Sequence, residues 1–184
     1  MTSADRLGLP ADLQRAVDFH GHVCPGLVIG YRAAKAAAHA LQVETSGDEE
    51  LILIAENDSC SVDAFQVLLS TTFGKGNLYF RDHGKQVFTV GDRHSERAVR
   101  VALRNDTRDR MGDSREERIQ NLLGASDEDI LNVQVVDLRL PDKAEIHETL
   151  QCARCREGVM STRTSAEGDK VYCLPCASDL GIGH

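Results

Sequence analysis

The spacing of apolar residues predicts two helices in the first part of the chain. Between residues 9 and 19, Leu13, Ala16 and Val17 recur at helical intervals. Beyond residue 25 the apolar positions recur at intervals of four and three, which indicates one buried helical face. These positions are Leu27, Tyr31, Ala34, Ala38 and Leu41. Pro25 suits the first position of the second helix, because the N–H that proline lacks would have no partner there.

Short apolar runs predict strands. Residues 51–55 (LILIA) form a continuous apolar run, which is typical of a strand covered on both faces. Residues 78–80 and 86–90 flank the polar sequence 82–85, and this arrangement predicts a β-hairpin with a short turn. A further strand is expected at residues 98–103. A last core strand is expected around Val133, Val135 and Leu138.

Two further helical segments are expected between these strands. After Cys60 the sequence SVDAFQVLLSTT carries an apolar stripe that includes Val62 and Phe65, and Gly74 is expected to end this helix. The charged segment 105–130 has an apolar face that includes Ile119 and predicts a surface helix, followed by a second capped turn at Ser126.

Four of the six cysteines lie near the C-terminus in two Cys-x-x-Cys pairs, Cys152 with Cys155 and Cys173 with Cys176. Each pair can offer two thiolates to one ion from a tight turn, and the segment between the pairs is long enough to fold back. Residues 147–184 are therefore expected to form a zinc-ribbon or treble-clef module around a structural Zn²⁺. Two redox dithiols or two disulfides are the alternative.

Composition and charge limit the classes of partner. The chain has 184 residues, a net charge of −8 and a pI near 5.3, which argues against a basic face for nucleic acid. No apolar run approaches the roughly 20 residues that cross a bilayer, so no membrane partner is expected. The N-terminal sequence lacks the basic-then-apolar layout of a signal peptide, and we expect a cytoplasmic protein.

The other two cysteines, Cys24 and Cys60, both fall at predicted helix starts, where backbone N–H groups and the helix dipole favour a thiolate. His20, His22 and Cys24 are spaced two apart, so in an extended segment they would point the same way. These four residues are expected to form a core site for a borderline-soft ion, Zn²⁺ ahead of Fe or Ni. Cys24, Cys60 and His22 are also the candidate catalytic residues.

Acidic residues beside Cys60 and a glycine-rich segment further along the chain are also candidates for functional contacts. Asp58 and Asp63 flank Cys60, where they can orient an imidazole ring or serve as ordinary acidic residues of a first helical turn. The sequence Gly-Lys-Gly-Asn at 74–77 can expose backbone N–H groups to an anion, which makes Lys75 and Asn77 candidate cofactor contacts. A glycine-rich end of the helix that leads into a strand is the alternative for this segment. The alternative for the core site is that the two thiols are small buried side chains and the histidines are hydrogen-bonded core residues.

Two long motifs, FHGHVCPGLVIGYRA and ENDSCSVDAFQVLLSTTFGKGNLYFRDHGK, resemble the FmdE family, which is named for one subunit of molybdenum or tungsten formylmethanofuran dehydrogenase. The resemblance implies an α+β core within residues 1–146, with a mixed or antiparallel sheet and packed helices, and a homodimer. It places His20, His22, Cys24 and Cys60 on positions that suggest a shared site. Positions that are typically polar in the family fall here on Gln66, Lys75, Asn77, Asp82 and Lys85. Phe73 follows Thr71 and Thr72 in a segment where relatives often carry a further cysteine.

These observations lead to competing functional hypotheses. The first is a metal-binding accessory or redox component of a molybdenum or tungsten oxidoreductase system, with the zinc finger docking the oxidoreductase partner protein. The second is a zinc-stabilised interaction or regulatory module that performs no chemistry. Delivery of a metal or cofactor to another enzyme is a third hypothesis.

Overall fold

The structure is a computed structural model that describes residues 8–143 and 145–183, without the side chains of residues 108 and 109. The chain divides into two compact units between Lys143 and Ala144. Each unit is built around its own cluster of buried apolar residues. None of the described helices is long and apolar enough to cross a membrane.

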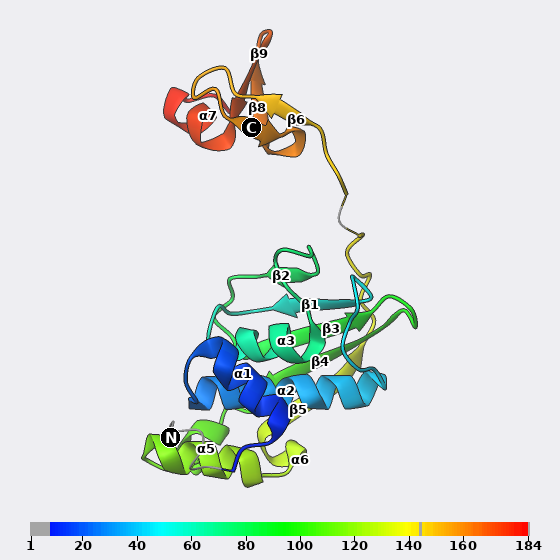
Figure 1. Cartoon of the computed structure of the whole chain (residues 1–184), viewed down its shortest axis with the longest axis vertical. Helices are drawn as coiled ribbons and strands as arrows, with labels where there is room; N and C mark the ends of the chain where they lie inside the picture. The colour runs from blue at the N-terminus through cyan, green and yellow to red at the C-terminus, as the bar shows by residue number, and fades with distance from the viewer. Residues whose placement is uncertain (1–7, 144, 184) are drawn as a thin grey trace. The chain divides into compact units, whose positions relative to one another are not determined.

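The first unit is an α+β domain with one five-stranded mixed sheet (Figure 1). Its strands follow the order β2-β1-β3-β4-β5, and every neighbouring pair is antiparallel except β1 and β2. The strands are β1 (Leu51–Ala55), β2 (Leu78–Phe80), β3 (Val87–Asp92), β4 (Arg97–Leu103) and β5 (Leu131–Val136). The helices are α1 (Ala11–His20), α2 (Pro25–Leu41), α3 (Ser61–Leu69), α4 (Thr107–Arg110), α5 (Arg115–Gly124) and α6 (Asp127–Ile130). The expected α+β fold with a mixed sheet is confirmed.

Most of the predicted elements are present. The strand at residues 51–55 is fully buried, and Pro25 occupies the first turn of α2. Ser114 and Glu117 form a capping box at the start of α5, and the side chain of Ser126 caps α6 as predicted. The helix after Cys60 ends earlier than predicted, because Ser70 adopts a left-handed conformation and stops α3 before Gly74.

The predicted hairpin between residues 78–80 and 86–90 is wrong. Strand β1 lies between these two segments, pairing parallel with β2 on one side and antiparallel with β3 on the other. The chain reaches β2 through helix α3, so β1, α3 and β2 form a β-α-β crossover of the kind that parallel strands require. The alternation of apolar and polar residues predicted both strands correctly. It could not show that β1 lies between them in the sheet.

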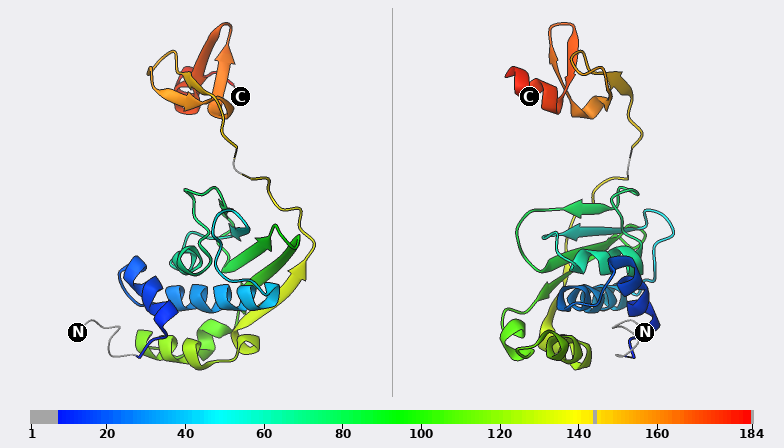
Figure 2. Two further views of the ribbon diagram at one scale, coloured as in Figure 1. Left: turned by 45° about the vertical axis from the view of Figure 1, so that its right-hand side comes forward. Right: turned by 60° about the vertical axis from the view of Figure 1, so that its left-hand side comes forward.

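Helices α2 and α3 cover one face of the sheet, and α1 and α5 pack against these helices (Figure 2). The buried residues of this face include Phe88 of β3, whose ring lies 4.6 Å from that of Phe65 on α3. On the opposite face, a side chain at Gly91 would collide with Leu140, so the segment after β5 returns across this face. Strand β5 is an edge strand, and Val135 is 67% exposed. Val133 and Val135 therefore lie in a strand, as predicted, but the prediction that their side chains are buried in the core is wrong.

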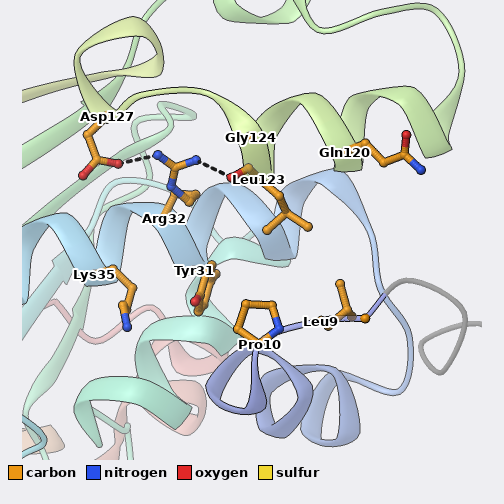
Figure 3. Close-up of a pocket in the computed structure, with 10 residues that line it drawn as sticks. Leu9, Pro10, Tyr31, Arg32, Lys35, Gln120, Leu123, Gly124 and Asp127 are labelled. Atoms are coloured by element: carbon orange, nitrogen blue, oxygen red, sulfur yellow. Dashed lines mark hydrogen bonds and ion pairs between the residues drawn. The ribbon is translucent and has the colours of Figure 1, made fainter.

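Arg32 of α2 fastens the C-terminal end of α5 to the rest of the core (Figure 3). Its guanidinium donates to the carbonyls of Leu122, Leu123 and Ala125 and pairs with Asp127 at 2.6 Å. The carbonyls at a helix end have no partner within the helix, and Arg32 supplies one. The cavity beside it measures about 600 Å³, and its two lining cations, Arg32 and Lys35, are both paired with carboxylates.

Replacing Arg32 with methionine is expected to lower the free energy of unfolding by about 2–3 kcal/mol, because several carbonyls lose a charged donor at a site where the arginine side chain is only 13% exposed. Chemical denaturation of the whole chain would measure this. Arg15→Met is the matched control, since Arg15 is exposed and is expected to change stability by less than about 0.5 kcal/mol. Equal losses of stability in the two variants would contradict the proposed role of Arg32 in holding the end of α5.

Among its described residues, the second unit contains two small antiparallel pairs of strands and one α-helix. Strands β6 (Thr149–Gln151) and β7 (Gly158–Met160) pair around the first two cysteines. The 3₁₀ helix η2 (Ser161–Arg163) leads to the hairpin of β8 (Thr164–Glu167) and β9 (Lys170–Cys173), and helix α7 (Leu174–Leu180) follows. The β6–β7 turn that carries the first cysteine pair (the knuckle), the β8–β9 hairpin and a helix that starts at the second pair are compatible with the predicted zinc-ribbon or treble-clef module.

Candidate metal centres

The four C-terminal cysteines converge in the second unit. The sulfurs of Cys152, Cys155, Cys173 and Cys176 all lie within 4.8 Å of one another. The sulfurs of Cys155 and Cys173 are 3.9 Å apart. Four sulfurs bound tetrahedrally to zinc at about 2.3 Å would be separated by about 3.8 Å. The group therefore has the donors and the spacing to hold one metal ion, as the two Cys-x-x-Cys pairs predicted.

Backbone N–H groups and neighbouring thiols change the pKa values of the cysteines in this group. The backbone N–H of Cys173 donates to the sulfur of Cys152 at 3.4 Å, and this bond above all lowers the pKa of Cys152 to about 6. The backbone N–H of Glu157 favours the thiolate of Cys155, but burial and the three neighbouring thiols outweigh it and raise the pKa of Cys155 to about 12. One thiol is thus ready to ionise, whereas the group as a whole needs a bound cation before all four can.

A second group lies in the first unit, where ligand atoms of His20, His22 and Cys24 all fall within 4.8 Å of one another. The sulfur of Cys24 is 3.8 Å from Nε2 of His20, and the two imidazole rings are 4.6 Å apart. An imidazole nitrogen and a thiolate bound tetrahedrally to one zinc ion would be separated by about 3.6 Å. Cys24 is buried and His22 is exposed, so the group reaches from the core to the surface.

The backbone brings these three side chains together in a different way from the prediction. His20 is the last residue of α1 and does not belong to an extended segment. Gly21 follows in a left-handed conformation with φ of 92°, which glycine adopts readily, and reverses the chain so that His22 returns beside His20. The extended backbone then reaches Cys24, which is the N-cap of α2, and its sulfur accepts the N–H of Leu27 at 3.3 Å. The expected position of Cys24 at a helix start is confirmed.

Asp63 of α3 orients the nearer imidazole. Its Oδ2 accepts the Nδ1–H of His20 at 2.7 Å, which leaves Nε2 of the ring free to face Cys24. The other oxygen of Asp63 accepts an N–H of Gln66 at 3.1 Å. A carboxylate that holds one ring nitrogen of a histidine is the usual support for metal binding through the other. The sequence raised this role for both Asp58 and Asp63, and only Asp63 contacts His20.

Cys60 lies beside this group without completing it. A Cβ added at Gly26 would lie 3.2 Å from the Cβ of Cys60 and 3.9 Å from the sulfurs of both Cys24 and Cys60, so both thiols lie close to Gly26. Cys60 is not one of the residues whose ligand atoms all lie within 4.8 Å. Its role as a ligand or as a catalytic thiol stays a prediction.

The expected ease of ionisation of Cys60 is wrong. Burial and the neighbouring thiol of Cys24 raise the pKa of Cys60 above its ordinary value. Cys60 precedes α3, but its side chain makes no capping hydrogen bond, and the one backbone N–H that favours its thiolate, its own, is outweighed by burial and Cys24. The sequence predicted correctly that Cys60 lies at the start of a helix. It could not predict the direction in which the sulfur points, and this direction decides whether the helix amides reach it.

The candidate cofactor contacts Lys75 and Asn77 are engaged within the protein. Asn77 is fully buried, its amide donates to the carbonyl of Leu51 at 2.9 Å, and its oxygen accepts the N–H of Thr72 at 2.8 Å. The ammonium of Lys75 donates to the carbonyl of Asp48 and the hydroxyl of Ser70. These bonds fix the turn between α3 and β2. Anion binding by the pair stays a prediction, and these contacts do not support it.

The family comparison matches the first unit. Residues 19–138 match the family model described as "FmdE, Molybdenum formylmethanofuran dehydrogenase operon". The matched range contains His20, His22, Cys24 and Cys60, and it ends before the four C-terminal cysteines.

Two known proteins are similar to the chain over most of its length. The crystal structure of a tungsten formylmethanofuran dehydrogenase FmdE-like protein from Syntrophus aciditrophicus has a TM-score of 0.69 and 26% identity, covering 91% of this chain and 90% of that one. A probable S-adenosyl-L-methionine-binding protein of Archaeoglobus fulgidus is 28% identical over 195 residues, covering 90% of this chain. The chain spans about half the length of this relative, 52%.

Proposed function

The chain belongs to the FmdE family, and on that premise we propose that its first unit binds a metal ion, Zn²⁺ ahead of Fe or Ni, through His20, His22 and Cys24. We further propose that the protein serves as an accessory or redox component of a molybdenum or tungsten oxidoreductase system. The observation that carries the metal site is the convergence of two imidazoles and a thiol, with Asp63 holding Nδ1 of His20. Thiolate and imidazole donors together suit zinc, with iron and nickel as less favoured ions.

The chemistry proposed for this site depends on the residues around the ion. When bound, the ion would supply a Lewis acid and a positive charge that favours thiolates. Asp63 would keep His20 in the tautomer that presents Nε2. The sulfurs of Cys24 and Cys60 both lie close to Gly26, and their joint oxidation to a disulfide would release two electrons and two protons to an oxidised partner centre.

The second unit is proposed to hold a structural Zn²⁺ through its four cysteines and to dock the oxidoreductase partner. Few of its residues are buried, and its exposed apolar side chains include Met160 and Leu180. A homodimer is also proposed, with the exposed side chains of edge strand β5 as the surface to be tested.

Metal analysis of the purified whole chain tests the core site. We expect two equivalents per chain, one of which is lost in the Cys24→Ala, Cys60→Ala double variant, whereas Cys152→Ser loses the other. Anomalous scattering at several metal edges would identify each ion. One tightly held equivalent that survives the double substitution would leave only the C-terminal group and would reject the core site.

Asp63→Ala is expected to weaken metal binding at the core site by about 10- to 100-fold, because His20 loses the carboxylate that fixes its tautomer and orientation. Competition with a chromophoric chelator would measure the affinity. Asp58→Ala is the matched control, since Asp58 also flanks Cys60 but makes no hydrogen bond to either imidazole. Equal affinities in the two variants would remove the proposed role of Asp63.

The alternative function, a zinc-stabilised interaction module without chemistry, is favoured by one observation. The sulfur of Cys24 already caps α2 by accepting the N–H of Leu27. On this alternative, His22→Ala would leave the core metal content and any electron exchange unchanged, while Cys24→Ala would lower the melting temperature alone. Loss of core metal in both variants would reject it.

A further inference from the structure

A cavity of about 310 Å³ opens at the carboxyl ends of the two parallel strands. Ala55 and Phe80, the last residues of β1 and β2, pair with each other and both line it. The start of α3 also lines the cavity, through Val62, Asp63 and neighbouring residues. The crevice beyond the carboxyl ends of parallel strands is where open α/β sheets commonly bind their ligands.

The mouth of this cavity is aromatic. Phe73 is 66% exposed and Phe80 is 43% exposed, although both side chains line the cavity. Val62 and Leu78 continue the apolar surface inward. Large aromatic side chains left open to water favour a partner that buries their faces, and a flat ring does so with the least loss of conformational freedom.

The polar part of the cavity offers acceptors without partners. Asp58 makes no hydrogen bond or ion pair with the described residues. Gln66 donates its N–H to Asp63, so its Oε1 remains without a partner among the described residues. None of the cavity's ten lining residues is lysine, arginine or histidine. A ligand with hydrogen-bond donors or a positive charge would therefore be favoured, and an anionic ligand would be repelled.

We propose that this cavity binds a small planar ring that bears an amino group and no negative charge. The ring lies against Phe73 and Phe80, and the amino group donates to Asp58 and Gln66. The proposal deepens the proposed function and rests on it in one respect: Asp63 lines the cavity and also holds His20, so the ligand would lie next to the metal-binding group.

Calorimetric titration of the whole metal-loaded chain tests the site with three probes of this class: adenine, adenosine and 2-aminobenzimidazole. Saturable binding of at least one probe is expected. Inosine, in which an oxygen replaces the amino group of adenosine, and AMP, which adds a phosphate, are the matched ligands and are both expected to bind more weakly than adenosine by about ten-fold or more. Failure of all three probes at millimolar concentration would overturn the proposal.

Substitutions locate the binding. Phe73→Ala is expected to weaken it by about 5- to 150-fold, which corresponds to the loss of ring stacking of about 1–3 kcal/mol. Asp58→Asn is expected to reduce the discrimination against AMP. Val135→Ala, which removes an equally exposed apolar side chain on the opposite edge strand, is expected to change nothing. Binding that is insensitive to both Phe73→Ala and Asp58→Asn would place the ligand elsewhere and overturn the assignment.

The metal content of the same samples separates this proposal from the proposed function. Probe binding to a chain that never takes up a core metal would leave the cavity standing and reject the metal site. Two metal equivalents per chain without any probe binding would leave the metal site standing and reject the proposed cavity ligand.

Discussion

Replacing Cys152 with serine is expected to unfold the second unit of the chain while the first unit stays folded. Cys152 is completely buried, and its sulfur accepts the backbone N–H of Cys173 from the start of the helix. The substitution removes one of the four candidate donors, so the ion proposed to hold the knuckle, the hairpin and helix α7 together would be lost or held weakly. The loss of metal and the loss of structure are expected to coincide.

The size of the effect follows from the small core of this unit. Among the described residues its buried apolar cluster consists of Cys152, Tyr172, Cys176 and Ala177, two of which are the proposed ligands themselves. Such a cluster cannot offset the conformational entropy of about 30 ordered residues. A structural zinc ion contributes about 10–16 kcal/mol at neutral pH in comparable small domains, which is enough to decide whether the unit folds.

Amide hydrogen exchange on the whole chain would measure this result. Protection of the strand amides between residues 149 and 173 is expected to disappear in Cys152→Ser and in wild-type protein treated with a strong chelator, while protection in β1, β3 and β4 persists. Met160→Ser is the matched control, since Met160 is 46% exposed and binds no metal. Retained protection in metal-free Cys152→Ser would show that the unit folds without an ion.

The elements that sequence analysis predicted correctly are those governed by local physics. The apolar run 51–55 is a strand buried along its whole length, and the four-three spacing after Pro25 is a helix. The two Cys-x-x-Cys pairs converge because a knuckle and a helix start each hold their own pair at short range. In each case the residues that determine the structure lie within a few positions of one another.

The errors concern information that is not local. The partner of residues 78–80 is β1, which lies more than 20 residues earlier, and a polar turn in the sequence cannot indicate this pairing. Val133 and Val135 have the composition of a core strand, but they lie at the edge of the sheet. The sequence predicted which residues form the candidate metal group in the core but not how they come together. A left-handed turn at Gly21, and not an extended segment, brings His22 back towards His20.

Gly30→Ala is expected to be the most damaging single-methyl change in the first unit. At Gly30, helix α2 passes so close to the start of α3 that an added Cβ would lie 2.1 Å from the carbonyl oxygen of Ser61 and 2.6 Å from its Cα. These are backbone atoms, which cannot rotate away as a side chain can. The two helices would have to separate, and the expected cost is about 3 kcal/mol or more.

The same separation would disturb the candidate metal centre. The close approach of α2 to α3 is what places Cys24, at the start of one helix, beside Cys60, which precedes the other. It also places Asp63 of α3 within 2.7 Å of His20. A shift of α3 by even one ångström would break that hydrogen bond, so Gly30→Ala is expected to lower core metal affinity along with stability.

Chemical denaturation and metal analysis of Gly30→Ala would measure the two effects together. Gly124→Ala is the matched control, because Gly124 also lies in a helix but a Cβ there meets no atom within 4 Å. Alanine at that position is expected to be neutral or to stabilise the chain by up to about 1 kcal/mol, since it reduces the freedom of the unfolded chain. A Gly30→Ala chain as stable as Gly124→Ala, with its core metal retained, would mean that the contact between α2 and α3 yields at little cost and does not position the site.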